Sequence, residues 1–182
     1  SEIIARYDGR LEIDELRTVE VAGEDGKNYE VVIGRTAEMR IVDANTGIVL
    51  SQHDIPYGAK LYIKNDSLVT KGDKICEWDA YNAVTISEVE GTVEYDSLVE
   101  GVTYREEAAD EFSLHREKVV IESRDRSKNP SIVIKKDGIE VKQYNLPVGA
   151  HIMVENGQEL VAGDILIKIP RAIGKSGDIT GG

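Results

Sequence analysis

The residues best suited to chemistry in this chain are three histidines and one cysteine. His53, His115 and His151 form no His-x-x-x-His or His-Glu-x-x-His pattern, and Cys76 has no second cysteine to complete a metal-ligand pair. A single cysteine excludes an internal disulfide and is typical of a reducing compartment. Because Cys76 stands in an apolar segment, a buried structural thiol is favoured over a nucleophile. We therefore expect no metal centre, no cofactor site, and packing or surface roles for the histidines.

Two short motifs resemble ion-binding loops but are incomplete. Asp43-x-Asn45-x-Gly47 matches the front of a calcium loop, yet the sixth position, which requires glycine, is Ile48. A hairpin turn is the better interpretation. Residues 174–176, Gly-Lys-Ser, match the end of a phosphate-binding loop, but position 169, where its first glycine belongs, is isoleucine. Residues 174–182 are therefore interpreted as a polar linker, and no motif for a catalytic centre is present.

The charge of the chain is acidic, with one basic exception. It has 22 Lys and Arg against 34 Asp and Glu, a formal net charge of −12 at pH 7, which argues against a general nucleic-acid or anionic-membrane binder. The exception is a loop with Arg124, Arg126 and Lys128, followed by Lys135 and Lys136. This loop could contact nucleic acid or an acidic protein face, although no aromatic residue is interleaved for base stacking. We interpret Arg124, Arg126 and Lys128 as a candidate partner contact. The alternative is that they form a solvated loop.

An internal repeat organises the chain. Residues 55–78, IPYGAKLYIKNDSLVTKGDKICEW, align without a gap with residues 146–169, LPVGAHIMVENGQELVAGDILIKI, 91 positions further on. Both copies keep a Pro-x-Gly-Ala turn, an asparagine and a Gly-Asp pair, and the match extends upstream to Ile41 and Ile132. Shared glycines and prolines indicate shared turns, and the apolar segments between them are typical of short strands. A period of this length fits a duplicated small domain better than a solenoid.

The sequence therefore predicts an all-β fold of two tandem domains related by internal duplication. We expect the first domain to span residues 1–105 and the second residues 106–173, with residues 1–21 able to pack with either. Residues 106–111, EEAADE, are interpreted as a helix or a solvated connection between the domains. No apolar run reaches the length of a membrane span and no signal peptide is found, so we expect a cytoplasmic location without a membrane partner.

The repeated units resemble half-motifs of biotinyl and lipoyl carrier domains, which have a barrel-sandwich hybrid fold. The matching residues are 90–93 (EGTV) and 69–75 (VTKGDKI). A carrier also requires a modifiable lysine at a hairpin tip, usually beside methionine or aspartate, and neither copy has one there. The resemblance thus implies the fold and not the carrier chemistry. A free-standing carrier or adaptor without enzymatic activity stays open as the alternative function.

A second resemblance covers nearly the whole chain. Residues 55–59 (IPYGA), Gly72-Asp73 and Trp78-Asp79 are similar to motifs of an insertion in the bacterial DNA-directed RNA polymerase β′ subunit family. In some lineages this insertion, made of two sandwich-barrel hybrid motif domains, interrupts the trigger loop. The last residues resemble the point where the chain re-enters the second trigger helix, which implies a trigger-loop junction at Asp178, Ile179, Thr180, Gly181 and Gly182.

The resemblance implies a noncatalytic module that modulates trigger-loop folding, and through it transcription elongation, pausing and transcript cleavage. The parent would be a nucleotidyltransferase whose Mg²⁺-holding aspartate motif is absent from this chain. The implied partners are other parts of the polymerase β and β′ subunits, with downstream DNA in proximity. The start at Ser1 without a methionine fits a piece of a longer protein.

Overall fold

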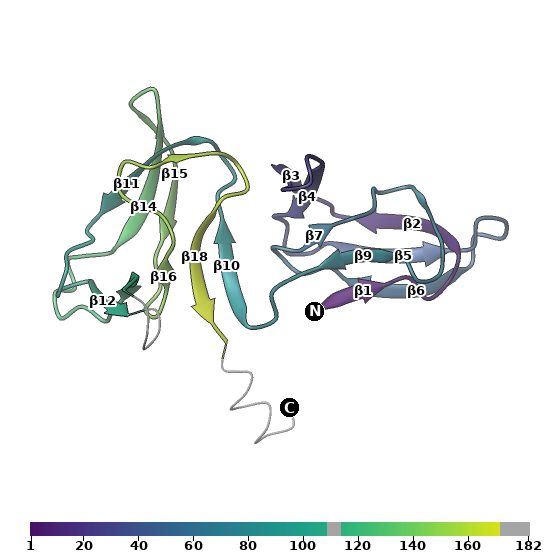
Figure 1. Cartoon of the computed structure of the whole chain (residues 1–182), viewed down its shortest axis with the longest axis horizontal. Helices are drawn as coiled ribbons and strands as arrows, with labels where there is room; N and C mark the ends of the chain where they lie inside the picture. The colour runs from purple at the N-terminus through teal and green to yellow at the C-terminus, as the bar shows by residue number, and fades with distance from the viewer. Residues whose placement is uncertain (109–113, 172–182) are drawn as a thin grey trace, which may run out of the picture. The chain divides into compact units, whose positions relative to one another are not determined.

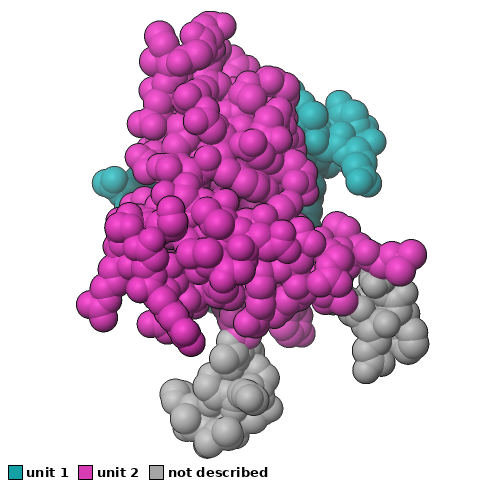
Figure 2. All heavy atoms as spheres, turned by 90° about the vertical axis from the view of Figure 1, so that its left-hand side faces the viewer, with its two compact units in different colours: residues 1–80 teal, residues 81–182 magenta. Residues whose placement is uncertain are grey.

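The computed structural model describes residues 1–108 and 114–171 (Figure 1). Within these ranges the chain contains no helix, and its strands form four sheets in which all neighbouring strands are antiparallel. The all-β class predicted from the sequence is therefore confirmed. The chain divides into two compact units, residues 1–80 and 81–182, which Figure 2 shows in different colours.

The first unit contains two sheets, with the strand orders β1-β9-β7-β4-β3 and β6-β5-β2-β8. Its strands are β1 (Glu2–Ile4), β2 (Gly9–Asp14), β3 (Thr18–Ala22), β4 (Asn28–Val32), β5 (Glu38–Val42), β6 (Val49–Asp54), β7 (Lys60–Leu61), β8 (Leu68–Val69) and β9 (Lys74–Glu77). One core lies in this unit and is formed chiefly by Leu11, Val32, Met39, Ile41, Ile55, Leu61 and Ile75.

The second unit also contains two sheets, with the orders β10-β18-β16-β13-β12 and β15-β14-β11-β17. Its strands are β10 (Asn82–Ile86), β11 (Gly91–Asp96), β12 (Tyr104–Ala108), β13 (Arg116–Val120), β14 (Ser131–Lys136), β15 (Ile139–Asn145), β16 (His151–Ile152), β17 (Glu159–Leu160) and β18 (Ile165–Pro170). A second core is formed chiefly by Val93, Val120, Ile132, Ile134, Ile152, Leu160 and Leu166.

The two units have the same topology, which confirms the duplication. Adding nine to each strand label of the first unit reproduces the strand orders of the second. The repeat is therefore longer than the segments that align without a gap. Equivalent glycines begin β2 and β11: a Cβ at Gly9 would come within 2.4 Å of the Val42 carbonyl oxygen, and one at Gly91 within 2.5 Å of the Lys135 carbonyl oxygen. Each glycine permits the close approach of a neighbouring strand.

The shared Pro-x-Gly-Ala turn holds the same position in both units. The amide of Gly58 donates to the Val32 carbonyl at 2.7 Å, and the amide of Val32 donates to the Ala59 carbonyl at 2.8 Å. In the second unit, the amide of Gly149 donates to the Val120 carbonyl at 2.8 Å, and the amide of Val120 donates to the Ala150 carbonyl at 2.9 Å. Gly58 and Gly149 have φ values of 88° and 91°, a left-handed conformation that favours glycine. The sequence repeat thus reports a backbone requirement of the fold.

The shared asparagines satisfy a backbone donor of a neighbouring strand. The Oδ1 atom of Asn65 accepts from the amide of Ile13 at 2.8 Å, and that of Asn156 accepts from the amide of Tyr95 at 2.9 Å. Both acceptors lie in loops that precede short strands, and both donors lie near the ends of β2 and β11. A side-chain oxygen thereby replaces the carbonyl that a longer paired strand would supply.

The division between the units differs from the boundary expected after residue 105. Strand β10 pairs with β18 along Asn82–Ile86, and β11 pairs with β14, so these strands belong to the second unit. Residues 1–21 belong with the first unit, because β1 pairs with β9 and β2 with β5. Glu106–Ala108 end strand β12, which pairs with β13, so these residues do not connect the units. Positions 109–111 of the EEAADE segment lie outside the described residues.

Hydrogen bonds tie the first and last described residues to the connection between the units. Ser1 exchanges two hydrogen bonds with Trp78: its amino group donates to the Trp78 carbonyl at 3.0 Å, and the Trp78 amide donates to the Ser1 carbonyl at 2.9 Å. At the other end, the amide of Arg171 donates to the Tyr81 carbonyl at 2.8 Å. Trp78 and Tyr81 flank the point where one unit ends and the next begins.

The asparagine contacts lead to a stability prediction. Asn65→Ala leaves the part-buried Ile13 amide without its acceptor and is expected to lower the free energy of unfolding by about 1–3 kcal/mol. Urea unfolding followed by the fluorescence of Trp78, the only tryptophan, measures this in the first unit. Asn156→Ala is the matched control, since it removes the equivalent contact from the other core. An unchanged midpoint for Asn65→Ala would contradict the assigned role.

Candidate interaction surfaces

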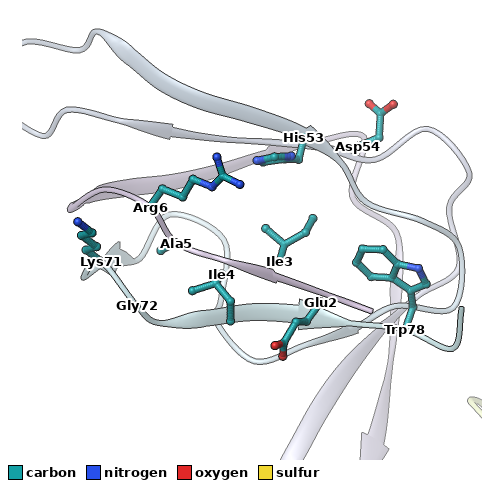
Figure 3. Close-up of a pocket in the computed structure, with 10 residues that line it drawn as sticks. All are labelled: Glu2, Ile3, Ile4, Ala5, Arg6, His53, Asp54, Lys71, Gly72 and Trp78. Atoms are coloured by element: carbon teal, nitrogen blue, oxygen red, sulfur yellow. The ribbon is translucent and has the colours of Figure 1, made fainter.

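A groove runs along the open side of the first unit. Strand β1 is the edge of one sheet and β6 is the edge of the other, and residues of both strands line the groove, which has a volume of about 640 Å³ (Figure 3). Its apolar wall consists of Ile3, the buried Ala5, and Trp78, where Ile3 and Trp78 also pack against the core. The pairing of β1 with β9 brings these residues together.

Charged side chains of both signs line the groove, and its two cations lack ion-pair partners over the described ranges. Arg6, Lys71 and the exposed His53 line it, and neither Arg6 nor Lys71 forms an ion pair with any residue that the structure describes. Glu2 also lines the groove, but its carboxylate lies 3.7 Å from Lys74 Nζ. Figure 3 shows the Asp54 carboxylate directed away from the other labelled side chains. Among the residues that the structure describes, Arg6 and Lys71 therefore line the groove without an ion-pair partner.

A cluster of tyrosines and lysines lies at the same sheet, around β4, β7 and β9. The rings of Tyr29 and Tyr62 meet edge to face with centroids 5.5 Å apart, and Lys60 Nζ lies 3.9 Å from the Tyr29 centroid. Lys74 pairs with Glu77 at 2.8 Å. The Tyr62 hydroxyl donates to Glu77, which raises the pKa of Tyr62. These groups satisfy one another, so the cluster offers no unpaired charge comparable to that of the groove.

The structure places Arg124, Arg126 and Lys128 in the loop between β13 and β14 of the second unit. Both arginines are exposed and form no ion pair with any described residue, whereas Lys128 is half-buried. Asp125 shapes the loop by accepting hydrogen bonds from the side chain and the amide of Ser127, and these bonds lower its pKa. The loop therefore presents two basic side chains to solvent from a locally ordered turn.

Lys135 and Lys136 do not extend this basic loop. Lys135 pairs with Glu94 at 2.7 Å and Lys136 pairs with Glu90, and both interactions raise the pKa of the lysine. Glu94 lies in β11 and Glu90 directly precedes that strand, so both lysine charges are neutralised by acidic residues of the neighbouring strand or next to it. The expected trigger-loop junction, Asp178 to Gly182, and the Gly-Lys-Ser segment lie outside the described residues.

The remaining chemical candidates occupy structural positions. Asp43 closes the β5–β6 hairpin by accepting from the amides of Asn45 and Thr46, both at 2.9 Å, and these bonds lower its pKa. The hairpin interpretation is therefore confirmed. His151 Nδ1 lies 2.7 Å from Glu117 Oε2 in the second unit. Over residues 1–108 and 114–171 there is no group of three or more His, Cys, Asp and Glu that could hold a metal ion.

Cys76 is fully buried in strand β9, as expected for a structural thiol. Desolvation raises the pKa of this thiol to about 11. Because the thiolate is the reactive form, burial and the raised pKa both suppress its reactivity.

Comparisons with known proteins relate the whole chain to one subunit. No protein-family model matches it. The DNA-directed RNA polymerase subunit beta′ of Parabacteroides distasonis is 54% identical over 182 residues, which cover 99% of this chain and 13% of that subunit. The subunit of Phocaeicola vulgatus is 52% identical over 181 residues, and that of Flavobacterium johnsoniae 45% identical over 183 residues, each covering 13% of the relative.

These relatives belong to one class of protein, the DNA-directed RNA polymerases. The chain is similar to one segment of the β′ subunit of these enzymes, and it spans 13% of the length of the relatives named above. The resemblance drawn from short motifs is thereby confirmed for the subunit. In the described parts of the chain, the structure contains no helix able to cross a membrane.

The buried thiol gives a reactivity prediction. At pH 8 the native Cys76 has only about 0.1% thiolate and no access to solvent, so Ellman's reagent is expected to react with it only after unfolding. The release of the thionitrobenzoate ion at 412 nm, in the presence and absence of about 6 M guanidinium chloride, measures the difference. Rapid and complete labelling of the native chain at pH 8 would contradict the assignment.

Proposed function

We propose that this chain is an insertion in the trigger loop of the RNA polymerase β′ subunit and modulates the folding of that loop. In this role it adjusts transcription elongation, pausing and transcript cleavage, in the cytoplasm where the polymerase works. It does so without catalytic groups or a cofactor of its own, and the catalytic Mg²⁺ belongs to the parent enzyme. Its partners are other parts of the β and β′ subunits, with downstream DNA nearby.

The observation that carries this proposal is the match of nearly the whole chain to a short part of a long subunit. Relatives of 45% to 54% identity align with 99% or more of this chain and only 13% of themselves. Each of the two units encloses its own core, which is typical of a self-contained module. The alternative, a free-standing carrier or adaptor, has no comparable support.

The proposed mechanism is mechanical. A folded body tethered to the trigger loop changes the balance between open and closed loop states only if it contacts the polymerase differently in the two states. A differential contact of about 1.4 kcal/mol shifts that balance tenfold. The exposed loop with Arg124 and Arg126 is one surface for such a contact, because its charges lack partners within the described chain and stand out from an acidic molecule.

Deletion of the module from its parent polymerase tests this function. Residues 2–177 are replaced with a short Gly-Ser linker, and single-nucleotide addition, pause lifetime and intrinsic transcript cleavage are measured on an assembled elongation complex. We expect nucleotide addition to persist, with pause lifetime and cleavage changed by about threefold to tenfold, the range of a differential contact near 1 kcal/mol. Unchanged kinetics would refute modulation, and complete loss of nucleotide addition would refute a noncatalytic role.

The basic loop permits a finer test in the intact polymerase. Arg124→Glu with Arg126→Glu is expected to move pause lifetime toward that of the deletion, by about twofold or more, because two unpaired exposed charges are reversed. Lys27→Glu with Lys64→Glu makes the same net change at two exposed lysines of the first unit. Equal effects of the two double variants would show that net charge, and not this loop, is responsible.

A further inference from the structure

The duplication provides an internal reference for the groove of the first unit. The amide of Gly72 donates to the carbonyl of Ala5 at 2.8 Å, and the amide of Gly163 donates to that of Ser87 at 2.8 Å. Ala5 and Ser87 are therefore equivalent, which makes Glu88 the counterpart of the next residue, Arg6. The gap-free repeat aligns His53 with Tyr144 and Trp78 with Ile169 in the same way.

In the second unit the equivalent seam is closed by its own side chains. Tyr144 packs against the core, and its hydroxyl accepts from the amide of Glu88 at 3.0 Å. The Glu88 carboxylate pairs with Lys142 at 3.0 Å. Tyr144 thus links β15 to the segment that follows β10, and the Glu88 carboxylate has a cationic partner.

The first unit has different residues at the positions equivalent to Tyr144, Glu88 and Ile169. His53 takes the place of the tyrosine and is exposed, Arg6 reverses the charge of Glu88, and Trp78 widens the apolar surface that Ile169 provides in the other copy. Lys71 adds a further cation where the second unit has Ala162. In a chain with a net charge of −12, the two cations Arg6 and Lys71, unpaired in the part of the chain that the structure describes, lie beside an apolar wall and form a surface suited to an acidic ligand with an apolar side chain.

The backbone of β1 adds a third feature. Ser1 pairs with Trp78 and Ile3 with Cys76, and residues of an antiparallel edge strand alternate between facing the neighbour and facing away. The peptide groups of Glu2 and Ile4 therefore point away from β9, toward the open edge of the sheet. Such an edge pairs with an added extended segment, in which main-chain hydrogen bonds give affinity and side-chain pockets give specificity.

We propose that this groove binds an extended acidic peptide segment of a protein partner. One large aliphatic side chain of the segment packs against Ile3 and Trp78, and its carboxylates pair with Arg6 and Lys71. A nucleic-acid strand fits less well, because the groove offers only one half-buried indole ring for base stacking. The inference concerns the first unit alone and does not depend on where the chain sits in the polymerase.

Trp78 reports directly on the groove, since it is the only tryptophan of the chain. The full 182-residue chain is titrated with an acetylated octapeptide that contains two leucines among glutamates and serines, and the Trp78 emission is followed. We expect a saturable change that weakens as salt is raised. The same peptide with lysine in place of glutamate, and an oligothymidylate of equal charge, are the comparison ligands and are expected to bind at least about tenfold more weakly.

Two substitutions introduce into the groove the residue types found at the equivalent positions of the second unit, Glu88 and Tyr144. Arg6→Glu and His53→Tyr are each expected to weaken the acidic peptide about tenfold, whereas Lys27→Glu, which makes the same charge change as Arg6→Glu on an exposed turn, is expected to change the affinity less than twofold. Circular dichroism melting confirms that each variant is folded. The proposal is overturned by the absence of saturation at millimolar peptide, by equal binding of the lysine peptide, by equal effects of Arg6→Glu and Lys27→Glu, or by tighter binding of the oligothymidylate.

Discussion

Reciprocal backbone hydrogen bonds between the repeated turns and the neighbouring strands determine how each unit is assembled. One turn attaches to Val32 through Gly58 and Ala59, and the Gly-Asp turn attaches to Ala5, whose amide donates to the Asp73 carbonyl at 2.8 Å. Both turns need a glycine with positive φ, so their geometry cannot be recovered by side-chain packing. The second attachment also fixes β1 beside β9, and it is β1 that forms one wall of the groove.

Much of this fold could be predicted from the sequence, because glycine, proline and asparagine at fixed spacing report turns directly. The division between the units could not, because the connections differ in length between the copies: Gly9 and Gly91 are 82 positions apart, whereas Pro56 and Pro147 are 91 apart. Strand pairing also corrects the alignment upstream of the β5–β6 hairpin. Ile41 lies opposite Leu11, and Ile134 lies opposite the equivalent Val93, so Ile41 corresponds to Ile134 and not to Ile132. The groove was missed for a related reason, since its residues come from four separate segments that only strand pairing brings together.

Comparison of the two copies separates what the fold requires from what is free to change. Residues that hold turns are the same in both, as with Asn65 and Asn156, whose side chains accept from equivalent backbone amides. Residues on the surfaces have diverged in charge and size. The aligned sequences already contained a signal for the groove: Trp78 is aligned with Ile169, and His53 is aligned with Tyr144. Positions that differ between the two copies without changing the turns therefore indicate candidate binding surfaces, even though the sequence contains no recognised catalytic motif.

The hydrogen bonds of Ser1 and Arg171 have a mechanical consequence within each unit. Tension applied at Ser1 would first load its two backbone bonds with Trp78, and tension applied at Arg171 would first load its bond with Tyr81. In each unit these backbone bonds would bear the load before the hydrophobic core does.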